Sequence, residues 1–185
     1  AKREELAFFD EQLAVVSAQI TNLRAQFFSS ISEEVTANYR AISGIDAELS
    51  VSFLPDVAEP LLPILQAEYP RDLARGATSR GAHHDDFCFT LDGVPLEDCG
   101  SRGEVRSAIL ALKMAEREFV QQTTESEPVL LLDDVFSELD ADRRRHLMEF
   151  ISGRQAFITT TDTPSRAVKD LDLPVIALDK GQWAP

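Results

Sequence analysis

The chain has 185 residues, of which 44% are hydrophobic and 27% are charged, which fits one ordinary soluble domain or one domain with an appendage. Its formal net charge of −14 argues against a broad nucleic-acid footprint on this chain alone, while leaving room for a local basic patch. No run approaches the roughly 18 consecutive apolar residues of a membrane span, and no secretory signal opens the chain. Cys88 and Cys99 flank an expected hairpin and could form a disulfide, but without an export signal we expect them to be reduced thiols.

Residues 1 to about 41 are expected to form one long helix, because apolar side chains recur at the alternating three- and four-residue spacing of a coiled-coil seam. The seam comprises Leu6, Phe9, Leu13, Val16, Ile20, Leu23 and Phe27. No second heptad stretch occurs in the chain. The helix either packs on its own domain or is one arm of a hairpin whose other arm lies outside the chain, and we carry the second interpretation forward.

The middle of the chain alternates between strand and helix patterns. A strand is expected over residues 48–54, a helix over 61–75, and a β-hairpin over 86–91 and 94–96 with the turn at Asp92-Gly93. Residues 103–121 are expected to be helical, with Val105, Ile109, Leu112 and Phe119 as the apolar stripe. Ala108 and Ala115 would allow another element to approach this helix closely.

The last third predicts a parallel sheet, because strands at 128–132, 155–161 and 174–178 alternate with helices at 141–152 and 163–170. The first of these strands is so apolar that we expect both of its faces to be buried. It ends at two adjacent carboxylates, Asp133 and Asp134, where ligands of open α/β sheets usually bind. Adjacent carboxylates repel each other, so we expect Mg²⁺ with a phosphate there rather than a simple turn cap.

A second candidate site is the start of the helix after Cys99. Ser101 and Gly103 fall in its first turn, where unpaired N–H groups can bind an anion. The alternative is a plain capping box between Ser101 and Glu104, which is at least as well supported by these residues alone.

Taken in order, these motifs resemble those of SMC-type ABC ATPases, and in particular the RecF family. The segment Ser101-Arg102-Gly103-Glu104-Val105-Arg106 is similar to the signature motif, and Leu130–Asp140 is similar to a Walker B strand followed by a D-loop. The stretches 81–86, 111–116 and 157–162 also resemble RecF-like segments. The resemblance is strong over residues 80–165 and general in the helical first third.

The resemblance implies a role for each matching residue. Asp133 would hold Mg²⁺ through water, and Asp134 would orient or deprotonate the attacking water. The signature residues would contact ATP bound to a second subunit; they are Ser101, Gly103, Glu104 and Arg106. Ser137 and Asp140 would lie in the D-loop across the dimer interface. Thr160 or Thr161 would occupy the H-loop position.

The chain departs from the family pattern in three places. Glu104 stands where the family usually has Gln, so that a carboxylate could repel the γ-phosphate. His84 stands where Arg is usual. No Gly-x-x-x-x-Gly-Lys-Ser/Thr loop occurs in the 185 residues, and we expect the loop to precede Ala1. This chain alone is therefore expected not to hydrolyse ATP.

Two polar clusters have simpler interpretations. Residues 83–86 (His-His-Asp-Asp) are consecutive in an extended segment and so rarely converge on one metal ion, which favours a loop or interface role. Residues 143–146 (Arg-Arg-Arg-His) lie beside Asp140 and Asp142 and are expected to form a solvated helix face with local ion pairs rather than a DNA patch.

The fold expected is α/β: the C-terminal portion of a RecF/SMC-like ABC-ATPase head (residues 81–185), with a helical arm and part of a second lobe (residues 1–80). The resemblance implies a cytoplasmic, nucleoid-associated homodimer that uses ATP and Mg²⁺, binds DNA at single-strand gaps or junctions, and works with RecR and RecO. It would act in DNA replication, recombination and repair, including the SOS response. Another SMC-like ATPase head and a non-catalytic interaction module are the alternatives. The isolated chain could cover its open sheet by forming a swapped or tightly packed dimer.

Overall fold

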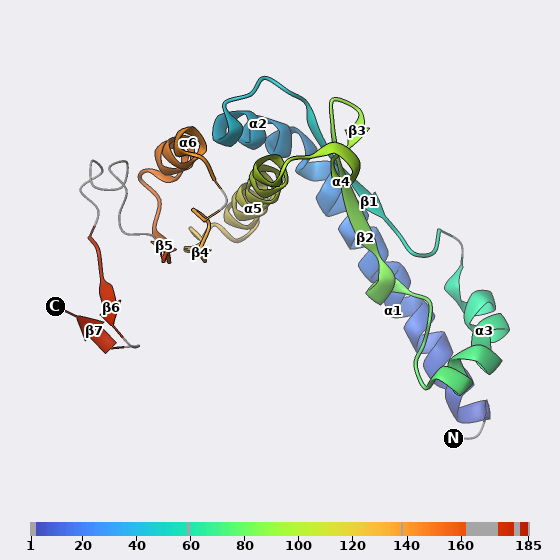
Figure 1. Cartoon of the computed structure of the whole chain (residues 1–185). Helices are drawn as coiled ribbons and strands as arrows, with labels where there is room; N and C mark the ends of the chain where they lie inside the picture. The colour runs from blue at the N-terminus through green and yellow to red at the C-terminus, as the bar shows by residue number, and fades with distance from the viewer. Residues whose placement is uncertain (1–2, 59, 138, 162–173, 180–181, 185) are drawn as a thin grey trace.

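The computed structural model describes residues 3–58, 60–137, 139–161, 174–179 and 182–184. Its elements, in chain order, are α1 (Arg3–Ser30), α2 (Ser32–Ser43), β1 (Leu49–Leu54), α3 (Leu61–Arg75), the 3₁₀ helix η1 (Ala82–His84), β2 (Asp86–Leu91), β3 (Val94–Pro95), α4 (Leu96–Cys99), α5 (Arg102–Thr124), β4 (Leu130–Leu132), α6 (Ala141–Ile151), β5 (Ala156–Ile158), β6 (Ala177–Asp179) and β7 (Gln182–Ala184). In Figure 1 the long helix α1 forms an arm with α3 beside its N-terminal end, while α2, α5 and α6 gather near its other end.

The first third contains two helices, not the single helix expected, because the chain breaks at Ile31. Serines surround the break and compete for backbone acceptors: Ser30 Oγ donates to Phe27 O at 2.8 Å, and Ser32 Oγ donates to Ser29 O at 3.4 Å. Serine side chains that bond back to the preceding turn bend helices. Ile31 itself is buried, so the bend also places an apolar side chain in the core.

The expected hairpin is present and forms part of a larger antiparallel sheet. β2 pairs with β3 around Asp92 and Gly93, whose φ values of 49° and 80° suit a tight hairpin turn. β1 pairs with β2 along its whole length, from Leu49 opposite Leu91 to Leu54 opposite Asp86. This pairing joins residues on both sides of position 80, so the two expected parts of the chain share one sheet.

The core is centred on α2, which contacts α5, α6 and β1, and it extends to Leu130 and Leu132 of β4. α5 packs into the core mainly through small or unbranched side chains. Its buried residues include Ser107, Ala108, Leu110, Ala111, Met114 and Ala115. The expected stripe was therefore wrong in part, because Ile109 is exposed and Val105, Leu112 and Phe119 are only partly buried. Alanines let the helix axes approach closely, and that approach moves the larger side chains to the edge of the contact.

β4 and β5 form the expected parallel pair, with Leu130 opposite Ala156 and Leu132 opposite Ile158. Only one face of this pair is covered, which corrects the expectation that β4 is buried on both faces. Leu130 and Leu132 are buried, but Leu131 is 77% exposed and lies beside the exposed Phe157. The described residues that pack on β4 and β5 come from one side only, so the apolar second face stays open.

The third strand of the predicted parallel sheet joins a different sheet. β6 pairs with β7 in an antiparallel hairpin, with Leu178 opposite Trp183. Two residues separate these strands in the sequence, so closing the loop between them costs little conformational entropy. Adding the strand in parallel to another sheet would instead need a long crossover connection. The helix expected over 163–170 lies outside the described residues.

The heptad seam of α1 does not pack on its own domain. Phe9, Val16 and Leu23 are exposed, the last to 63%. The helix contacts α3, η1 and β1, and the adjacent face that carries Ser17, Thr21 and Arg24 makes the hydrogen bonds to Ala82 and Asp85. Phe27, at the C-terminal end of the seam, packs inward, with its ring centroid 5.1 Å from that of Phe119, and Leu6 and Leu13 are partly buried. The first interpretation of the seam is therefore wrong for most of its length. Within the described residues, no helix is both long and apolar enough to cross a bilayer.

Candidate nucleotide half-site

The first group of candidate residues lies where β4 ends and the chain turns toward α6. Thr159, which follows β5, connects the two strands at this point. Its hydroxyl donates to Asp133 Oδ1 and accepts a hydrogen bond from Asp134 N at 3.1 Å, while its backbone N donates to Leu132 O at 3.0 Å. The parallel register thus places a hydroxyl side chain from the neighbouring strand against both acids.

Asp134 carries a carboxylate that the described part of the chain leaves unsatisfied. Its Oδ1 atom is buried without a hydrogen-bond partner among the described residues. Its backbone has a φ of 47°, a left-handed conformation that Asp tolerates better than most side chains. A buried acceptor without a partner costs about 1–3 kcal/mol, so such a group in a native fold points to a ligand or water that completes its bonding.

The donor set fits a magnesium ion that is shared with a phosphate. Two adjacent carboxylates stand at an accessible strand end, and no group of three or more His, Cys, Asp or Glu side chains converges within the described residues. Mg²⁺ is usually held by one or two carboxylates together with water and substrate phosphates, not by an all-protein cage. Asp133 and Asp134 meet that requirement.

The turn after Asp134 holds the expected D-loop residues. Ser137 Oγ donates to Asp134 O at 2.9 Å, and Asp140 is the N-cap of α6. The carboxylate of Asp140 accepts hydrogen bonds from Arg143 N at 2.9 Å and Arg143 Nη1 at 2.7 Å. The backbone hydrogen bond from Arg143, with the charge of its guanidinium, lowers the pKa of Asp140.

The expected signature residues lie at the start of α5, where Ser101 and Glu104 form a capping box. Glu104 Oε2 accepts hydrogen bonds from Ser101 N at 2.8 Å and Ser101 Oγ at 2.7 Å, while Ser101 Oγ accepts one from Glu104 N at 3.3 Å. The plain structural interpretation of these two residues is therefore confirmed. Arg106 lines a small surface hollow of about 270 Å³ one turn further along α5, together with Gly100, Arg102, Val105 and Ile109.

Arg143 brings the D-loop and the signature helix together. Its guanidinium lies against Gly103, where a Cβ atom would come within 2.7 Å of Nη1. The same Nη1 atom makes the ion pair with Asp140. Glycine at position 103 is thus explained by a close approach, and one cation connects two of the expected nucleotide-contacting segments.

The basic run 143–146 was therefore predicted wrongly in part. The side chain of Arg143 is only 17% exposed, and Arg144 Nε donates to Leu139 O at 2.8 Å. His146 packs against Gly44. The expected local pairing is confirmed for Arg143 with Asp140 and for Arg145 with Asp142, but of these two arginines Arg145 alone is also solvent-exposed. These side chains turn inward because α6 packs on α2.

The expected H-loop positions, Thr160 and Thr161, are exposed at the end of β5. Thr159, which sequence reasoning passed over, is the residue that contacts the acids. The parallel pairing of Leu132 with Ile158 places the residue after each strand at the same edge, so that register could have identified Thr159.

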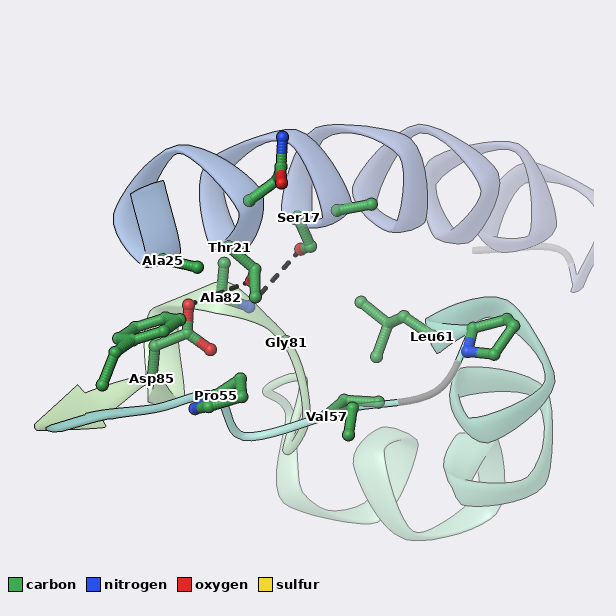
Figure 2. A pocket seen from close by; sticks show the side chains of 14 residues that line it. Ser17, Thr21, Ala25, Pro55, Val57, Leu61, Gly81, Ala82 and Asp85 are labelled. Carbon is green, nitrogen blue, oxygen red and sulfur yellow. Dashed lines mark hydrogen bonds between the residues drawn. The ribbon is translucent and has the colours of Figure 1, made fainter. Parts of the chain in front are cut away.

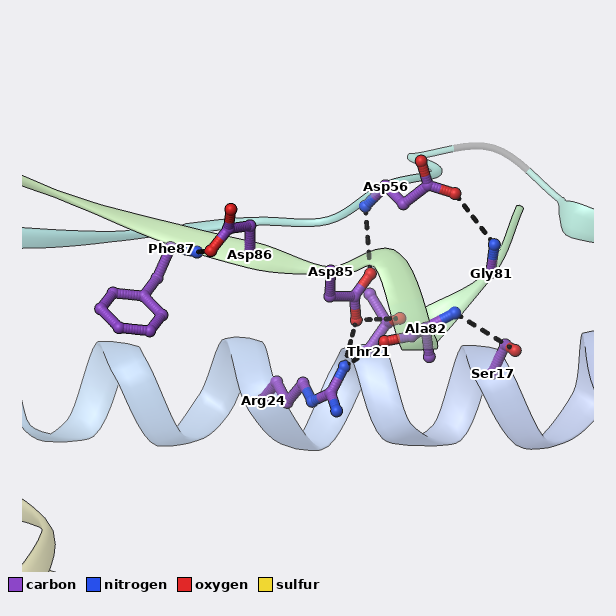
Figure 3. Close-up of polar contacts among 9 residues, drawn as sticks. All are labelled: Ser17, Thr21, Arg24, Asp56, Gly81, Ala82, Asp85, Asp86 and Phe87. Carbon is purple, nitrogen blue, oxygen red and sulfur yellow. Dashed lines mark hydrogen bonds and ion pairs between the residues drawn. The ribbon is translucent and has the colours of Figure 1, made fainter. Parts of the chain in front are cut away.

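A second polar cluster lies on the arm, around Asp85 (Figure 3). Asp85 accepts hydrogen bonds at 3.0 Å from Thr21 Oγ1, Arg24 Nη1 and Asp56 N, and its side chain is only 2% exposed. Asp56 in turn accepts a hydrogen bond from Gly81 N at 2.9 Å. This network fastens the 3₁₀ helix and the chain after β1 to the side of α1.

Next to this cluster is a cavity of about 540 Å³ between α1, η1 and the connection from β1 to α3. Figure 2 shows Ser17, Thr21 and Ala25 of α1 on one side and Pro55, Val57 and Leu61 on the other. Its wall is mainly apolar, and Asp85 at its edge already has its donors within the chain. Cys88 and Cys99 are both free thiols, as expected.

No family model matches the chain, but individual proteins do. It is 36% identical to the DNA replication and repair protein RecF of Trichlorobacter lovleyi, over 96% of this chain and 51% of that protein. It is 39% identical to RecF of Moorella thermoacetica (91% of this chain, 47% of that protein) and 44% identical to RecF of Geobacter sp. strain M21 (83% and 42%).

Solved structures give the same answer for the fold. A structure of the recombination mediator RecF with ATP superposes with a TM-score of 0.70 at 29% identity, covering 90% of this chain and 47% of that one. An SMC ATPase structure shares the fold alone, with a TM-score of 0.54 at 13% identity. The fold is that of a RecF/SMC-like ATPase head. The chain therefore belongs to the RecF family and spans about half the length of the curated relatives it matches.

Proposed function

We propose that this chain is the C-terminal part of a RecF-like, ATP-dependent DNA-binding protein that dimerises when it binds ATP. The observation that carries the proposal is the acid pair at the end of β4, where Asp134 Oδ1 is buried without a partner among the described residues. The relatives are RecF proteins, and a RecF structure with ATP shares the fold. In this proposal residues 81–185 belong to the ATPase head and residues 1–80 to a helical arm and second lobe.

Each site residue has a role in the proposal. Asp133 holds Mg²⁺ through water, and the ion would neutralise charge on the phosphates when it is bound. Asp134 orients the attacking water and takes its proton, with Thr159 fixing the backbone beneath it. Thr160 or Thr161 stands close to the leaving phosphate.

The other residues act across the dimer. Ser101, Gly103 and Arg106 contact the γ-phosphate on the second subunit through the N-terminal end of α5, where backbone N–H groups favour an anion, and Glu104 is the acidic member of the same signature segment. Ser137 and Asp140 lie at the interface between the subunits. Arg143, which contacts Gly103 and pairs with Asp140, keeps these two surfaces in register.

The partners in this proposal are DNA at single-strand gaps or junctions, a second copy of the protein, and RecR and RecO. The relatives are DNA replication and repair proteins, which supports the same role for the protein that contains this chain. The net charge of −14 argues against a broad DNA-binding surface on this part of the protein and leaves room for a local basic patch. A cytoplasmic, nucleoid-associated location and a place in the SOS response belong to the same proposal.

The phosphate-binding loop lies, in this proposal, in a segment that precedes Ala1. The test compares this 185-residue chain with the full-length protein that contains it. The full-length protein is expected to dimerise and to hydrolyse ATP in the presence of Mg²⁺, and the chain alone to show no turnover. Measurable turnover by the contaminant-free chain, or a full-length protein whose sedimentation is the same with and without ATP, would contradict the proposal.

A further inference from the structure

The anion-binding end of α5 is already occupied by an anion from the chain itself. One oxygen of Glu104, Oε2, accepts both the Ser101 N–H and the Ser101 hydroxyl, at 2.8 and 2.7 Å. The hydroxyl and the first-turn N–H groups of a helix are the donors that a bound phosphate uses. The Ser101 hydroxyl has one proton, which it cannot give to Glu104 and to a phosphate at the same time.

The carboxylate is held in its charged form. Hydrogen bonds from the side chain and backbone of Ser101, together with the nearby Arg143 guanidinium, keep the pKa of Glu104 below its usual range. A charged carboxylate at the helix start also gains from the helix dipole. It therefore competes with a phosphate in two ways: it takes the same donors, and it repels a second negative charge.

We propose that Glu104 is a built-in competitor for phosphate, which lets the start of α5 receive the nucleotide of a second subunit only after its carboxylate releases Ser101. This inference rests on the proposed function of α5 as the signature helix. Glu104 thereby raises the ATP concentration that dimerisation requires. Arg143 remains in place against Gly103 through its ion pair with Asp140 when Glu104 moves away.

The test titrates the full-length protein with a non-hydrolysable ATP analogue and Mg²⁺ and follows dimerisation by sedimentation velocity. Glu104→Gln keeps an oxygen that can cap the helix but removes the charge, so it is expected to lower the half-saturating analogue concentration roughly tenfold. Glu104→Ala removes the competing carboxylate entirely and is expected to shift the midpoint in the same direction. Glu116→Gln is the matched control, because it removes the same charge from the same helix where Glu116 pairs with Lys113 at 2.7 Å, and it should leave the midpoint unchanged.

Ser101→Ala separates failure of this inference from failure of the proposed function. If α5 is the signature helix, this variant weakens analogue-driven dimerisation. Dimerisation that is weakened by Ser101→Ala but unchanged or weakened by both Glu104 variants would overturn the competitor role alone. Dimerisation that never responds to the analogue, or that ignores Ser101→Ala, would overturn the signature assignment and the inference that rests on it.

Discussion

The two pairs of adjacent aspartates, Asp85-Asp86 and Asp133-Asp134, differ in how fully the chain itself supplies hydrogen-bond donors to their carboxylates. The side chain of Asp85 is only 2% exposed and receives three hydrogen bonds at 3.0 Å from its own chain, and Asp86 Oδ1 accepts one from Phe87 N at 2.8 Å. Asp133 and Asp134 stand at a strand end, and one oxygen of Asp134 has no partner among the described residues. An acid whose donors come from the chain supports the fold, whereas an acid left without them is available to a ligand.

The largest effect on stability is expected from the first pair. Asp85→Ala leaves Thr21, the Asp56 N–H and the Arg24 guanidinium without their shared acceptor, and should lower the free energy of unfolding by about 3 kcal/mol. Urea unfolding measures the change. Asp86→Ala is the matched control and should cost under about 1 kcal/mol, because it removes one exposed contact. Equal losses for the two variants would show that burial does not distinguish them.

A smaller loss is expected where Arg143 joins the D-loop to α5. Arg143→Ala removes the ion pair with Asp140 and the packing on Gly103, so it should lower the free energy of unfolding by about 1–2 kcal/mol. Arg145→Ala, which removes an exposed pair with Asp142, should cost about 0.5 kcal/mol or less. Thermal unfolding of the two variants side by side decides whether the inward position of Arg143 matters.

Acid should weaken the cap of α5 by a still smaller amount. The folded pKa of Glu104 lies below its ordinary value of 4.5, so the unfolded chain binds the proton more readily. The contribution is therefore complete above that value and is lost as the pH falls through the lowered folded pKa. The stability difference between the parent and Glu104→Ala, about 1 kcal/mol at pH 7, should shrink toward zero in acid. A difference that grows in acid would have the wrong sign.

The smallest change is expected at the second pair. Asp133→Asn should alter the free energy of unfolding by under about 1 kcal/mol, because Asn keeps an oxygen for the Thr159 hydroxyl and relieves the repulsion between adjacent carboxylates. Chemical unfolding in the absence of nucleotide and Mg²⁺ measures it. A loss as large as that for Asp85→Ala would make Asp133 a structural acid.

Sequence patterns predicted what local chemistry decides. The Asp92-Gly93 turn and the Ser101–Glu104 cap follow from short-range preferences, and the parallel pairing of residues near 130 and 157 follows from the alternation of strands and helices along the chain. Specific side-chain contacts between distant segments were not predicted. The contact of Thr159 with the acids depends on strand register, and that of Arg143 with Gly103 depends on helix packing. The helix break at Ile31 and the exposed face of β4 around Leu131 were not predicted either, because a heptad pattern or an apolar run does not reveal what packs against it.

The most direct test of the account is the hydrolysis of ATP by the full-length protein carrying Asp134→Asn, with Asp86→Asn as the matched control. Asn tolerates the left-handed backbone at position 134 but cannot take a proton, so turnover should fall at least about 100-fold while ATP-driven dimerisation persists. Asp86→Asn should hydrolyse ATP at the parental rate. Parental turnover by the Asp134 variant would contradict the assignment of the acid pair.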